Sequence, residues 1–404
     1  MTLKYIHNNL VLAVIGALED IFNRNQYADK VVERVLTSNK KWGSRDRRFI
    51  AHAIYECVRW KRYYRHVDRT VRNTSTSDWY GVLAVYLIQN AYQLPQIPEF
   101  SSINAEHIHQ ELQNKSMERA VRESIPEWLD ELGTQELGSQ WDKEIKALNH
   151  QAGVVIRANT LKTTRDELQK QLKNEGIETE ILKGYPDALK LLNRTKISHT
   201  KAFKEGLFEV QDASSQLVAP FLDVKPGDFV VDACAGGGGK ALHLAALMHN
   251  KGKLLAMDIY PSKLNNLKKR AHRNAVTIVE TLVVDNLKKI TPWLATADKV
   301  LIDAPCSGLG VLRRNPDAKW KLNLQFIRDL ENSQYEILES YAALVKTGGQ
   351  VVYATCSILP SENESIIKKF LHKNKAYKFV KELKVSPAQS GYDGFYMALL
   401  EKTH

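Results

Sequence analysis

Cysteine is scarce in this chain of 404 residues, which has four, at positions 57, 234, 306 and 356. Thiols this few and this scattered exclude a disulfide-stapled scaffold, which packs several cysteine pairs into a short sequence. No Cys-x-x-Cys pair or Cys/His cluster has the spacing of a zinc site, so we expect no metal. This cysteine usage is typical of a protein in a reducing compartment, and we expect the chain to be cytoplasmic.

Long hydrophobic runs are also missing. The apolar run Leu10-Val-Leu-Ala-Val-Ile-Gly-Ala-Leu18 is far shorter than the roughly 20 residues that a membrane span needs. It continues into Glu19 and Asp20 without the small-residue cleavage site of a signal peptide. We therefore predict a buried helix here and no membrane partner.

Acidic residues are outnumbered by basic ones. The chain has 57 Lys and Arg against 46 Asp and Glu, a net charge of +11, while 44% of its residues are hydrophobic. This composition excludes wholesale disorder and collagen-like repeats, and the length allows about two to three domains. The positive excess favours a polyanionic partner.

The first part of the chain, to about residue 145, is predicted to be mostly helical. Apolar side chains at helical spacing predict one buried stripe, made of Phe49, Ile50, Ala53, Ile54, Cys57 and Val58. Basic and aromatic side chains alternate around it: Lys40, Lys41, Arg45, Arg47, Arg48, Arg59, Lys61, Arg62 and Arg65 with Trp42, Trp60, Tyr63 and Tyr64. Such a mixture suits phosphate pairing and base stacking, so we expect RNA contact; a solvated helix face with core aromatics is the alternative.

Residues 126 to about 200 are predicted to form a small α/β unit. Val154-Val-Ile156 has the composition of a strand, and residues 163–174 have the pattern of a helix that ends at Gly176.

From about residue 205, short apolar runs alternate with helical patterns. Five runs end in a polar or small residue, at Asp232, Asp258, Asp285, Asp303 and Thr355. Helical patterns fill most of the gaps, at residues 240–250, 262–274 and 322–345. This alternation predicts a doubly wound, mainly parallel sheet with helices on both faces. Ligands bind outside the carboxyl ends of such strands, so the aspartates predict one shared binding site.

The glycine-rich turn after the first of these strands predicts the cofactor. A P-loop would need Ser or Thr where Ala241 stands, and neither register of the dinucleotide fingerprint holds. S-adenosylmethionine carries no phosphate, and Asp258 and Asp285 could accept hydrogen bonds from its ribose and adenine. An acidic site also suits its sulfonium cation. We predict S-adenosylmethionine as methyl donor, bound by Cys234, Ala235, Gly236, Gly237, Gly238, Gly239, Lys240, Asp258, Asp285 and Asp303.

Two cysteines follow the fourth and fifth predicted strands. Cys306 lies in Asp303-Ala-Pro-Cys-Ser-Gly308, and Cys356 lies between Thr355 and Ser357. A single cysteine at such a place is commonly a small buried hydrophobe. Two of them on the cofactor side of the sheet favour a chemical role.

These segments carry a family resemblance. The succession DACAGGGGK, LLAMD, VVD, DAPCSG, RRNPDAKW, YATCSILPSENE and YDGFYMALLEK resembles the RsmB/NSUN family of RNA (cytosine-5) methyltransferases. Upstream, RDRRFI and YECVRW resemble a NusB-like helical domain, and VVIRANTLK resembles the small RNA-binding α/β domain of the RsmB-like branch. The resemblance implies a class I methyltransferase with a Rossmann-like sheet at 205–404, after a helical domain at 1–140 and a small α/β domain at 141–204. Gly237 departs from the family, which usually has Pro there.

The family's mechanism implies a role for each catalytic candidate. Cytosine C5 is a poor nucleophile, so a thiolate, assigned to Cys356, first adds at C6. Asp303, protonated, would stabilise the charge that develops at N3, and Lys240 would orient Asp303 or the base. Cys306 would remove the C5 proton and allow the thiol to leave. The cytidine must be single-stranded or flipped to reach these groups.

We therefore expect a monomeric enzyme that methylates C5 of a cytidine in 16S rRNA. A tRNA cytosine-5 methyltransferase shares these motifs and stays open, as does a non-catalytic RNA-binding ribosome assembly factor. An N-methyltransferase would carry Asn/Asp-Pro-Pro-aromatic where this chain has DAPC, and a DNA cytosine-5 enzyme would leave Cys356 unexplained. Arg313 and Arg314 are candidates for phosphate contact, or belong to a solvated loop.

Overall fold

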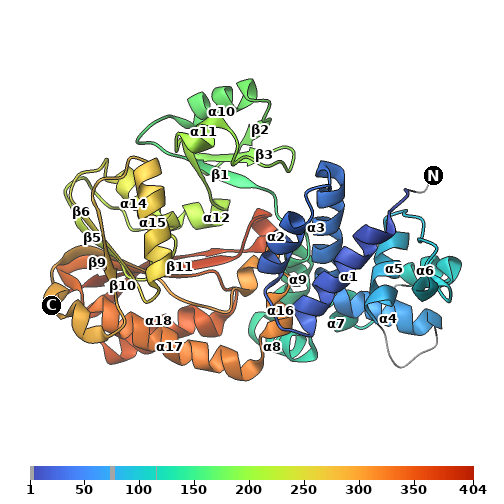
Figure 1. The fold of residues 1–404 in the computed structure, drawn as a ribbon. Coiled ribbons are helices and arrows are strands. Elements are labelled where there is room, and N and C mark those ends of the chain that lie inside the picture. Colours follow the sequence, from blue (N-terminus) through green and yellow to red (C-terminus); the bar gives the residue numbers. More distant parts are fainter. Residues whose placement is uncertain (1–3, 73–77, 115) are drawn as a thin grey trace. The chain divides into compact units, whose positions relative to one another are not determined.

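The computed structural model describes residues 4–72, 78–114 and 116–404, which form two compact units (Figure 1). Unit 1 comprises Met1–Asn149 and Leu312–Leu324, and unit 2 comprises His150–Val311 and Gln325–His404. In the part of the chain that the structure describes, no helix is long and apolar enough to cross a membrane.

Unit 1 is built from helices. They are α1 (Asn8–Phe22), α2 (Ala28–Ser38), α3 (Ser44–Arg59), α4 (Lys61–Arg72), α5 (Trp79–Gln89), α6 (Ala105–Leu112), α7 (Arg119–Arg122), α8 (Glu127–Leu137), α9 (Trp141–Leu148) and α16 (Ala318–Lys321), with 3₁₀ turns η1 (Pro98–Phe100) and η2 (Gly138–Gln140). The apolar run from Leu10 to Leu18 lies in α1, where Val11, Val14 and Leu18 are buried. The predicted stripe on α3 is buried at all six positions. Both helix predictions are confirmed.

Residues 312–324 join unit 1 although unit 2 lies on both sides of them in the chain. Asp317 accepts a hydrogen bond from the backbone N–H of Ala28 (3.0 Å), at the start of α2. The indole of Trp320 donates to the carbonyl of Val58 (2.7 Å) on α3. This insertion is therefore part of the helical core.

Unit 2 begins with a small four-stranded antiparallel sheet of order β2-β3-β1-β4. Its elements are β1 (Val155–Ala158), α10 (Arg165–Asn174), β2 (Thr179–Ile181), β3 (Ala188–Leu191), α11 (Lys201–Lys204) and β4 (Phe208–Val210). Thr164 and Glu167 form a capping box at the start of α10. After its end, Gly176 takes a φ of +78°, a conformation that favours glycine. The predicted strand and helix are confirmed.

A seven-stranded sheet of order β10-β11-β9-β8-β5-β6-β7 forms the rest of unit 2. Its strands are β5 (Phe229–Asp232), β6 (Lys253–Asp258), β7 (Val279–Val283), β8 (Ala297–Asp303), β9 (Val345–Thr355), β10 (Tyr377–Val385) and β11 (Phe395–Lys402). Strands β5 to β9 are parallel, and β11 runs antiparallel to both β9 and β10. Four strands end at the predicted residue, but β7 ends at Val283, so the prediction that it ends at Asp285 is wrong.

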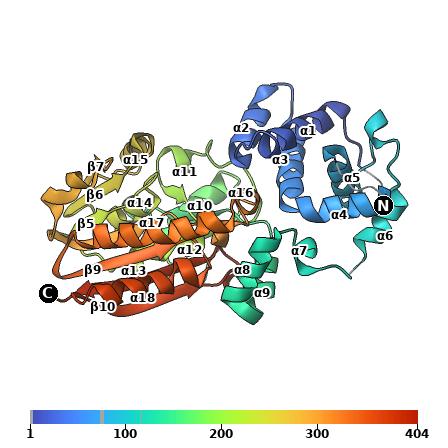
Figure 2. The same ribbon diagram turned by 90° about the horizontal axis from the view of Figure 1, so that it is seen from below.

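Helices cover both faces of this sheet (Figure 1). They are α12 (Ala213–Gln216), α13 (Val218–Phe221), α14 (Gly239–Leu247), α15 (Pro261–Arg273), α17 (Leu324–Ala342), α18 (Glu364–Lys373) and α19 (Pro387–Ser390), with 3₁₀ turns η3 (Leu287–Trp293), η4 (Leu309–Val311) and η5 (Pro360–Glu362). Successive residues of a strand point to opposite faces. Val352 accordingly packs with α14 and α15, and Val351 with α17 and α18, which cross the other face (Figure 2). The doubly wound, mainly parallel α/β sheet is confirmed.

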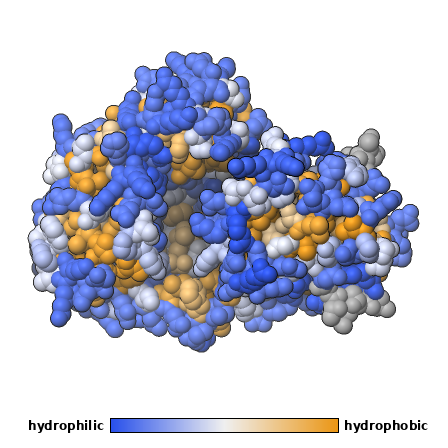
Figure 3. Space-filling view, in the orientation of Figure 1, coloured by the Kyte–Doolittle hydropathy of each residue, from blue (hydrophilic) through white to orange (hydrophobic). Residues whose placement is uncertain are grey.

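Hydrophilic side chains predominate over α2 and α3 of unit 1 and over α10 and α11 of unit 2 on the face shown in Figure 3.

The small sheet and the seven-stranded sheet belong to one compact unit. The division into three domains, with boundaries after residues 140 and 204, therefore stays a prediction.

Candidate active site

The glycine-rich loop joins the end of β5 to the start of α14. Gly236 (φ +54°) and Gly238 (φ +85°) adopt left-handed conformations that glycine allows at little cost. A Cβ on Gly238 would also lie 2.5 Å from Cγ of Leu267 on α15. The loop can thus pack closely on α15 and expose backbone to a ligand only because side chains are absent here.

Asp258, at the end of β6, is tied to this loop. One carboxylate oxygen accepts from the backbone N–H of Gly236 (2.9 Å), and the other accepts from the N–H of Tyr260 (2.8 Å). Each oxygen keeps a further lone pair. The side chain is held in one orientation and can still accept hydrogen bonds from a diol.

Asp232, at the end of β5, differs from Asp258 in its hydrogen bonding. Its side chain is buried, and neither carboxylate oxygen has a hydrogen-bonding partner among the described residues. Burial and the negative charge of Asp303 raise the pKa of Asp232 to about 7. The charge of Lys240 and the backbone N–H of Cys234 offset this rise only in part, so a cationic ligand would further stabilise the ionised carboxylate. No individual role was predicted for Asp232 from the sequence. Its position at the end of a strand is the signal that could have identified it as a site residue.

Side chains from distant segments hold the same loop. Arg270 on α15 donates to the carbonyl of Gly237 (2.5 Å), and Arg157 on β1 donates to the carbonyl of Gly239 (2.9 Å). Glu209 on β4 binds the other end of the Arg270 guanidinium (2.8 Å). A Cβ at position 237 would lie 3.2 Å from the Arg270 guanidinium. Gly237, where the family usually has Pro, is thus the residue whose carbonyl Arg270 binds. Glu209 of the small sheet holds Arg270 in this position.

Lys240 and Asp303 form an ion pair beneath the loop. Nζ of Lys240, in the first turn of α14, lies 2.6 Å from Oδ2 of Asp303 at the end of β8. Burial lowers the pKa of Lys240, but the carboxylate of Asp303 outweighs burial and the pKa is raised overall. Lys240 therefore stays charged, and the pair joins a proton donor to an acceptor.

The two strand-end cysteines meet. Sγ of Cys306 lies 3.2 Å from Sγ of Cys356, both side chains are partly buried, and both thiols are free. The hydrogen bond to Cys356 and burial raise the pKa of Cys306. Cys306 thus keeps its proton and can donate it toward Cys356.

Glu362 fastens the two cysteine loops together. This fully buried carboxylate accepts from the backbone N–H of Ser307 (2.8 Å), from its hydroxyl (2.5 Å) and from the hydroxyl of Ser357. Gln334 on α17 donates a further hydrogen bond (2.9 Å). The residues after Cys306 and Cys356 are therefore held by the same carboxylate. Glu362 lies in the PSENE segment of the sequence, but no role was predicted for it.

The remaining predicted site residues differ in their surroundings. Cys234 and Ala235 lie in the loop, and burial and Asp232 raise the pKa of the Cys234 thiol. Asp285 is exposed and pairs with Lys289 (2.9 Å). No hydrogen bond or ion pair among the described residues joins Asp285 to the other predicted site residues.

Several cations of the predicted RNA-contacting region are structural. Arg59 is buried, donates to the carbonyl of Arg313 (3.0 Å) and pairs with Glu56 (3.1 Å). Arg47 donates to the carbonyls of Asn39 and Trp42. Both arginines therefore hold backbone carbonyls of unit 1 in place, a role that neither RNA contact nor a solvated helix face had predicted.

The residues at the carboxyl edge of the large sheet fit S-adenosylmethionine. Asp232 offers a buried negative charge without an internal partner, and the cofactor carries a sulfonium and an ammonium group. Asp258 offers lone pairs for the ribose diol, and the glycine loop leaves room for the ligand. S-adenosylmethionine, when bound, would supply the methyl group.

Comparisons with known proteins agree with this site. The family model for 16S rRNA methyltransferase RsmB/F matches residues 219–401, and that of an RsmF/B-like ferredoxin-like domain matches residues 125–198. The "Probable ribosomal RNA small subunit methyltransferase B" of Synechocystis sp. is 30% identical, over 95% of this chain and 97% of its own. The Bacillus subtilis protein of the same name is 35% identical over 70% of this chain and 67% of its own.

The crystal structure of PH0851 covers 99% of this chain and 100% of its own, with a TM-score of 0.84 and 27% identity. The class I methyltransferase fold and the S-adenosylmethionine cofactor predicted from the sequence are confirmed. This chain belongs to the RsmB/F family of S-adenosylmethionine-dependent RNA methyltransferases.

Proposed function

We propose that this chain methylates C5 of a cytidine in 16S rRNA through a covalent adduct. The observation that carries the proposal is the pair of thiols, 3.2 Å apart at the ends of β8 and β9. Methyl transfer to a heteroatom needs no nucleophilic thiol. Methyl transfer to C5 of cytosine does, because this ring carbon must first be activated by addition of a thiolate at C6. The names of the Synechocystis and Bacillus subtilis relatives favour small-subunit rRNA as the substrate.

Cys356 is the nucleophile in this proposal. Its thiolate adds to C6 of the cytosine, and the electron pair displaced toward N3 is met by a proton from the Lys240–Asp303 pair, whose atoms lie 2.6 Å apart. The adduct makes C5 an enamine carbon, which takes the methyl group.

Cys306 completes the reaction. Its pKa is raised chiefly by the hydrogen bond with Cys356, and formation of the C6 adduct removes that bond. Cys306 then loses its proton to solvent more readily and accepts the proton from C5. Elimination breaks the S–C6 bond, N3 returns its proton to the Lys240–Asp303 pair, and one proton is released in the net reaction.

The product and the RNA class test the proposal. The full chain would be incubated with tritiated S-adenosylmethionine and either unmodified 16S rRNA or unmodified tRNA, and the RNA digested to nucleosides. We expect labelled 5-methylcytidine from 16S rRNA, and none with the Cys356→Ser variant. Label in another nucleoside would contradict cytosine-5 chemistry, and 5-methylcytidine from tRNA alone would favour the tRNA alternative.

A further inference from the structure

A cavity within unit 1 is lined largely by cations. It encloses about 410 Å³ between α4, the segment from α7 to α8, and α16. Its basic side chains come from one helix, α4, and its aromatic wall is Trp320. None of its nine lining residues is acidic. A cavity of this size can accommodate a phosphate group with its sugar.

Among the described residues, three of these basic side chains form no ion pair with a carboxylate. No carboxylate among the described residues pairs with Lys61, Arg65 or Arg69, which follow one another at intervals of four along α4. The acid on α4, Asp68, is buried and pairs with Arg72 (2.6 Å). Like charges four residues apart destabilise a helix, so this row is unfavourable unless an anion binds to it.

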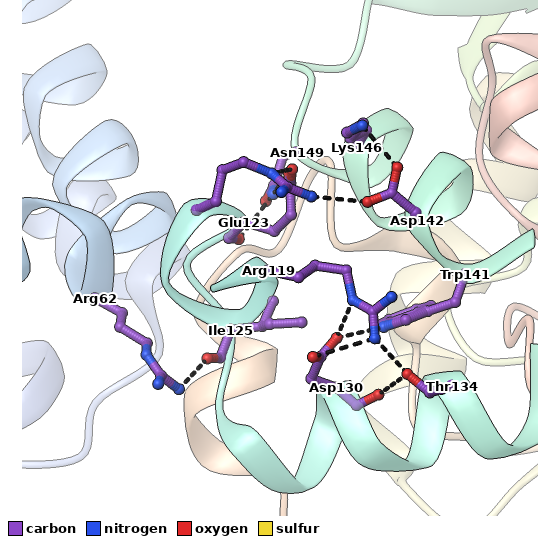
Figure 4. Close-up of polar contacts among 11 residues, drawn as sticks. Arg62, Arg119, Glu123, Ile125, Asp130, Thr134, Trp141, Asp142, Lys146 and Asn149 are labelled. Carbon is purple, nitrogen blue, oxygen red and sulfur yellow. Dashed lines mark hydrogen bonds and ion pairs between the residues drawn. The ribbon is translucent and has the colours of Figure 1, made fainter. Parts of the chain in front are cut away.

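Neighbouring arginines of the same unit are paired, as Figure 4 shows. Arg62 donates to the carbonyl of Ile125 (2.8 Å), as the figure shows. It also pairs with Glu127. Arg119 binds Asp130 (2.7 Å), which is drawn in the same figure. Arg122 binds Asp142 (2.8 Å). These pairs fix the segment from α7 to α8 that forms one wall of the cavity. The unpaired row is therefore a local feature and not a general excess of arginine.

Aromatic rings hold two of the unpaired cations in place. The ammonium of Lys61 lies 3.9 Å from the ring centre of Trp320 and 4.4 Å from that of Phe22. The guanidinium of Arg65 lies 4.5 Å from the ring centre of Trp79. Nε of Arg65 is buried and has no acceptor among the described residues. The rings position these groups without pairing them with a negative charge. Burial and the neighbouring charge of Arg65 lower the pKa of Lys61 to about 7, so a bound phosphate would favour the charged form of this lysine.

We infer that this cavity binds a backbone phosphate of single-stranded RNA through Lys61, Arg65 and Arg69. Guanidinium groups match phosphate oxygens in a two-pronged geometry, and several cations around one cavity fix where the strand runs. The inference rests on the RNA substrate of the proposed function and not on which atom is methylated. It assigns to unit 1 a specific RNA contact that lies outside the catalytic residues.

Fluorescence anisotropy with a labelled single-stranded oligoribonucleotide tests this inference on the full chain, without S-adenosylmethionine, at several KCl concentrations. The test variant is Arg65→Gln/Arg69→Gln. The matched control, Lys30→Gln/Lys143→Gln, removes the same charge from exposed positions on α2 and α9. We expect the test variant to bind about tenfold more weakly near 0.1 M salt, and its log–log salt slope to fall by about one. The control should change affinity less than twofold.

Arg65 packs on Trp79, so its replacement could disturb folding. Arg69 is exposed, and Arg69→Glu alone should weaken binding by a similar factor with an unchanged thermal midpoint. Wild-type affinity in both variants would overturn the inference, as would an equal loss in the control. Displacement of the RNA by millimolar AMP would also overturn it, in favour of a free-nucleotide site. The labelled-nucleoside assay separately tests the proposed function, so either idea can fail alone.

Discussion

Asp232 and Asp258 end neighbouring parallel strands, yet their carboxylates are in opposite situations. Asp258 accepts two backbone hydrogen bonds, from Gly236 and from Tyr260. Asp232 is buried without partners, and its pKa is raised to about 7. The site therefore holds one carboxylate that is already satisfied and one that a bound cation would stabilise.

The raised pKa of Asp232 makes cofactor binding depend on pH. A cationic ligand favours the ionised carboxylate, which is depleted below about pH 7. We expect the affinity for S-adenosylmethionine to rise between pH 6 and pH 8, with about half a proton released on binding near pH 7, where about half of the Asp232 carboxyl groups are protonated. In the free protein the sign is opposite, because a raised carboxyl pKa costs native stability as pH rises from about 4 toward 7.

Isothermal titration calorimetry in two buffers of different ionisation enthalpy measures both the affinity and the released proton. Asp232→Asn should bind more weakly and lose this pH dependence. An affinity for the wild-type protein that is flat from pH 6 to pH 8 would contradict the role given to Asp232.

Glu362 supports a second residue-scale prediction. Glu362→Gln removes a buried negative charge that accepts hydrogen bonds from Ser307, Ser357 and Gln334. An amide cannot accept all of them, so we expect a loss of about 2–3 kcal/mol in the free energy of unfolding. The two cysteine loops should also lose their register, lowering kcat more than it changes KM.

Urea unfolding and steady-state methylation measure these two effects. Glu336→Gln, at an exposed position on α17, is the matched control and should leave both unchanged. A Glu362→Gln variant with full stability and full kcat would show that the cysteine loops hold each other without this anchor.

At the scale of elements, the glycine loop depends on segments outside its own βα unit. Arg270 links the carbonyl of Gly237 to Glu209 on the small sheet. Burial raises the pKa of Glu209, but Arg270 and Arg273 outweigh it, so its pKa is lowered overall and it stays ionised. The loop is thus held in shape by a charge network and not by local backbone rigidity.

Arg270→Leu should therefore weaken the cofactor site. We expect the KM for S-adenosylmethionine to rise about tenfold with a smaller change in kcat, since a charge-assisted hydrogen bond of about 1.5–3 kcal/mol is lost. Arg270→Lys should restore part of the affinity, and Lys268→Gln, exposed on the same helix, should have no effect. If Arg270→Leu lowered kcat alone, Arg270 would be acting on the chemical step and not on the loop.

The sequence was a good guide to buried parallel strands. In β5, β6, β8 and β9 an apolar run ends in a polar or small residue, so the strand end and the candidate site residue are visible together. The edge strands lack this signal. β7 carries Glu280 and Thr281, and β10 is exposed over most of its length, so the end of the first was misplaced and the second was not predicted.

The hydrogen bonds and ion pairs that hold the glycine loop could not be predicted from the sequence either. Arg157 lies 82 residues from Gly239, and Glu209 lies 61 residues from Arg270. No periodic pattern links such pairs, because the fold alone brings them together. Glu362 is closer to Cys356, but a single acid in a loop does not reveal that it will be buried.

At the scale of the whole molecule, the insertion of residues 312–324 into unit 1 makes the two units interdependent. Lys319 is buried in unit 1 and donates to Asn149 (3.2 Å). Arg59 donates to the carbonyl of Arg313 (3.0 Å), and Trp320 donates to that of Val58 (2.7 Å). The chain of unit 2 is thus interrupted by a segment that belongs to unit 1 and whose partners lie in the first 149 residues.

Cutting the chain before residue 150 should therefore expose this segment. We expect the fragment 150–404 to aggregate or to bind a hydrophobic dye, because a buried lysine and a partly buried tryptophan lose their surroundings. Replacing residues 312–324 with a short Gly/Ser linker should restore soluble fragment. Size-exclusion chromatography measures both, and a monodisperse 150–404 fragment would contradict the dependence.

In the proposed mechanism Cys356 attacks the base and Cys306 allows its release. Cys306→Ala and Cys356→Ala, each incubated with labelled 16S rRNA and S-adenosylmethionine, would be run on a denaturing gel. We expect an RNA–protein adduct that accumulates with Cys306→Ala and is absent with Cys356→Ala. An adduct with Cys356→Ala alone would reverse the two roles, and no adduct with either variant on rRNA or tRNA would contradict the covalent mechanism.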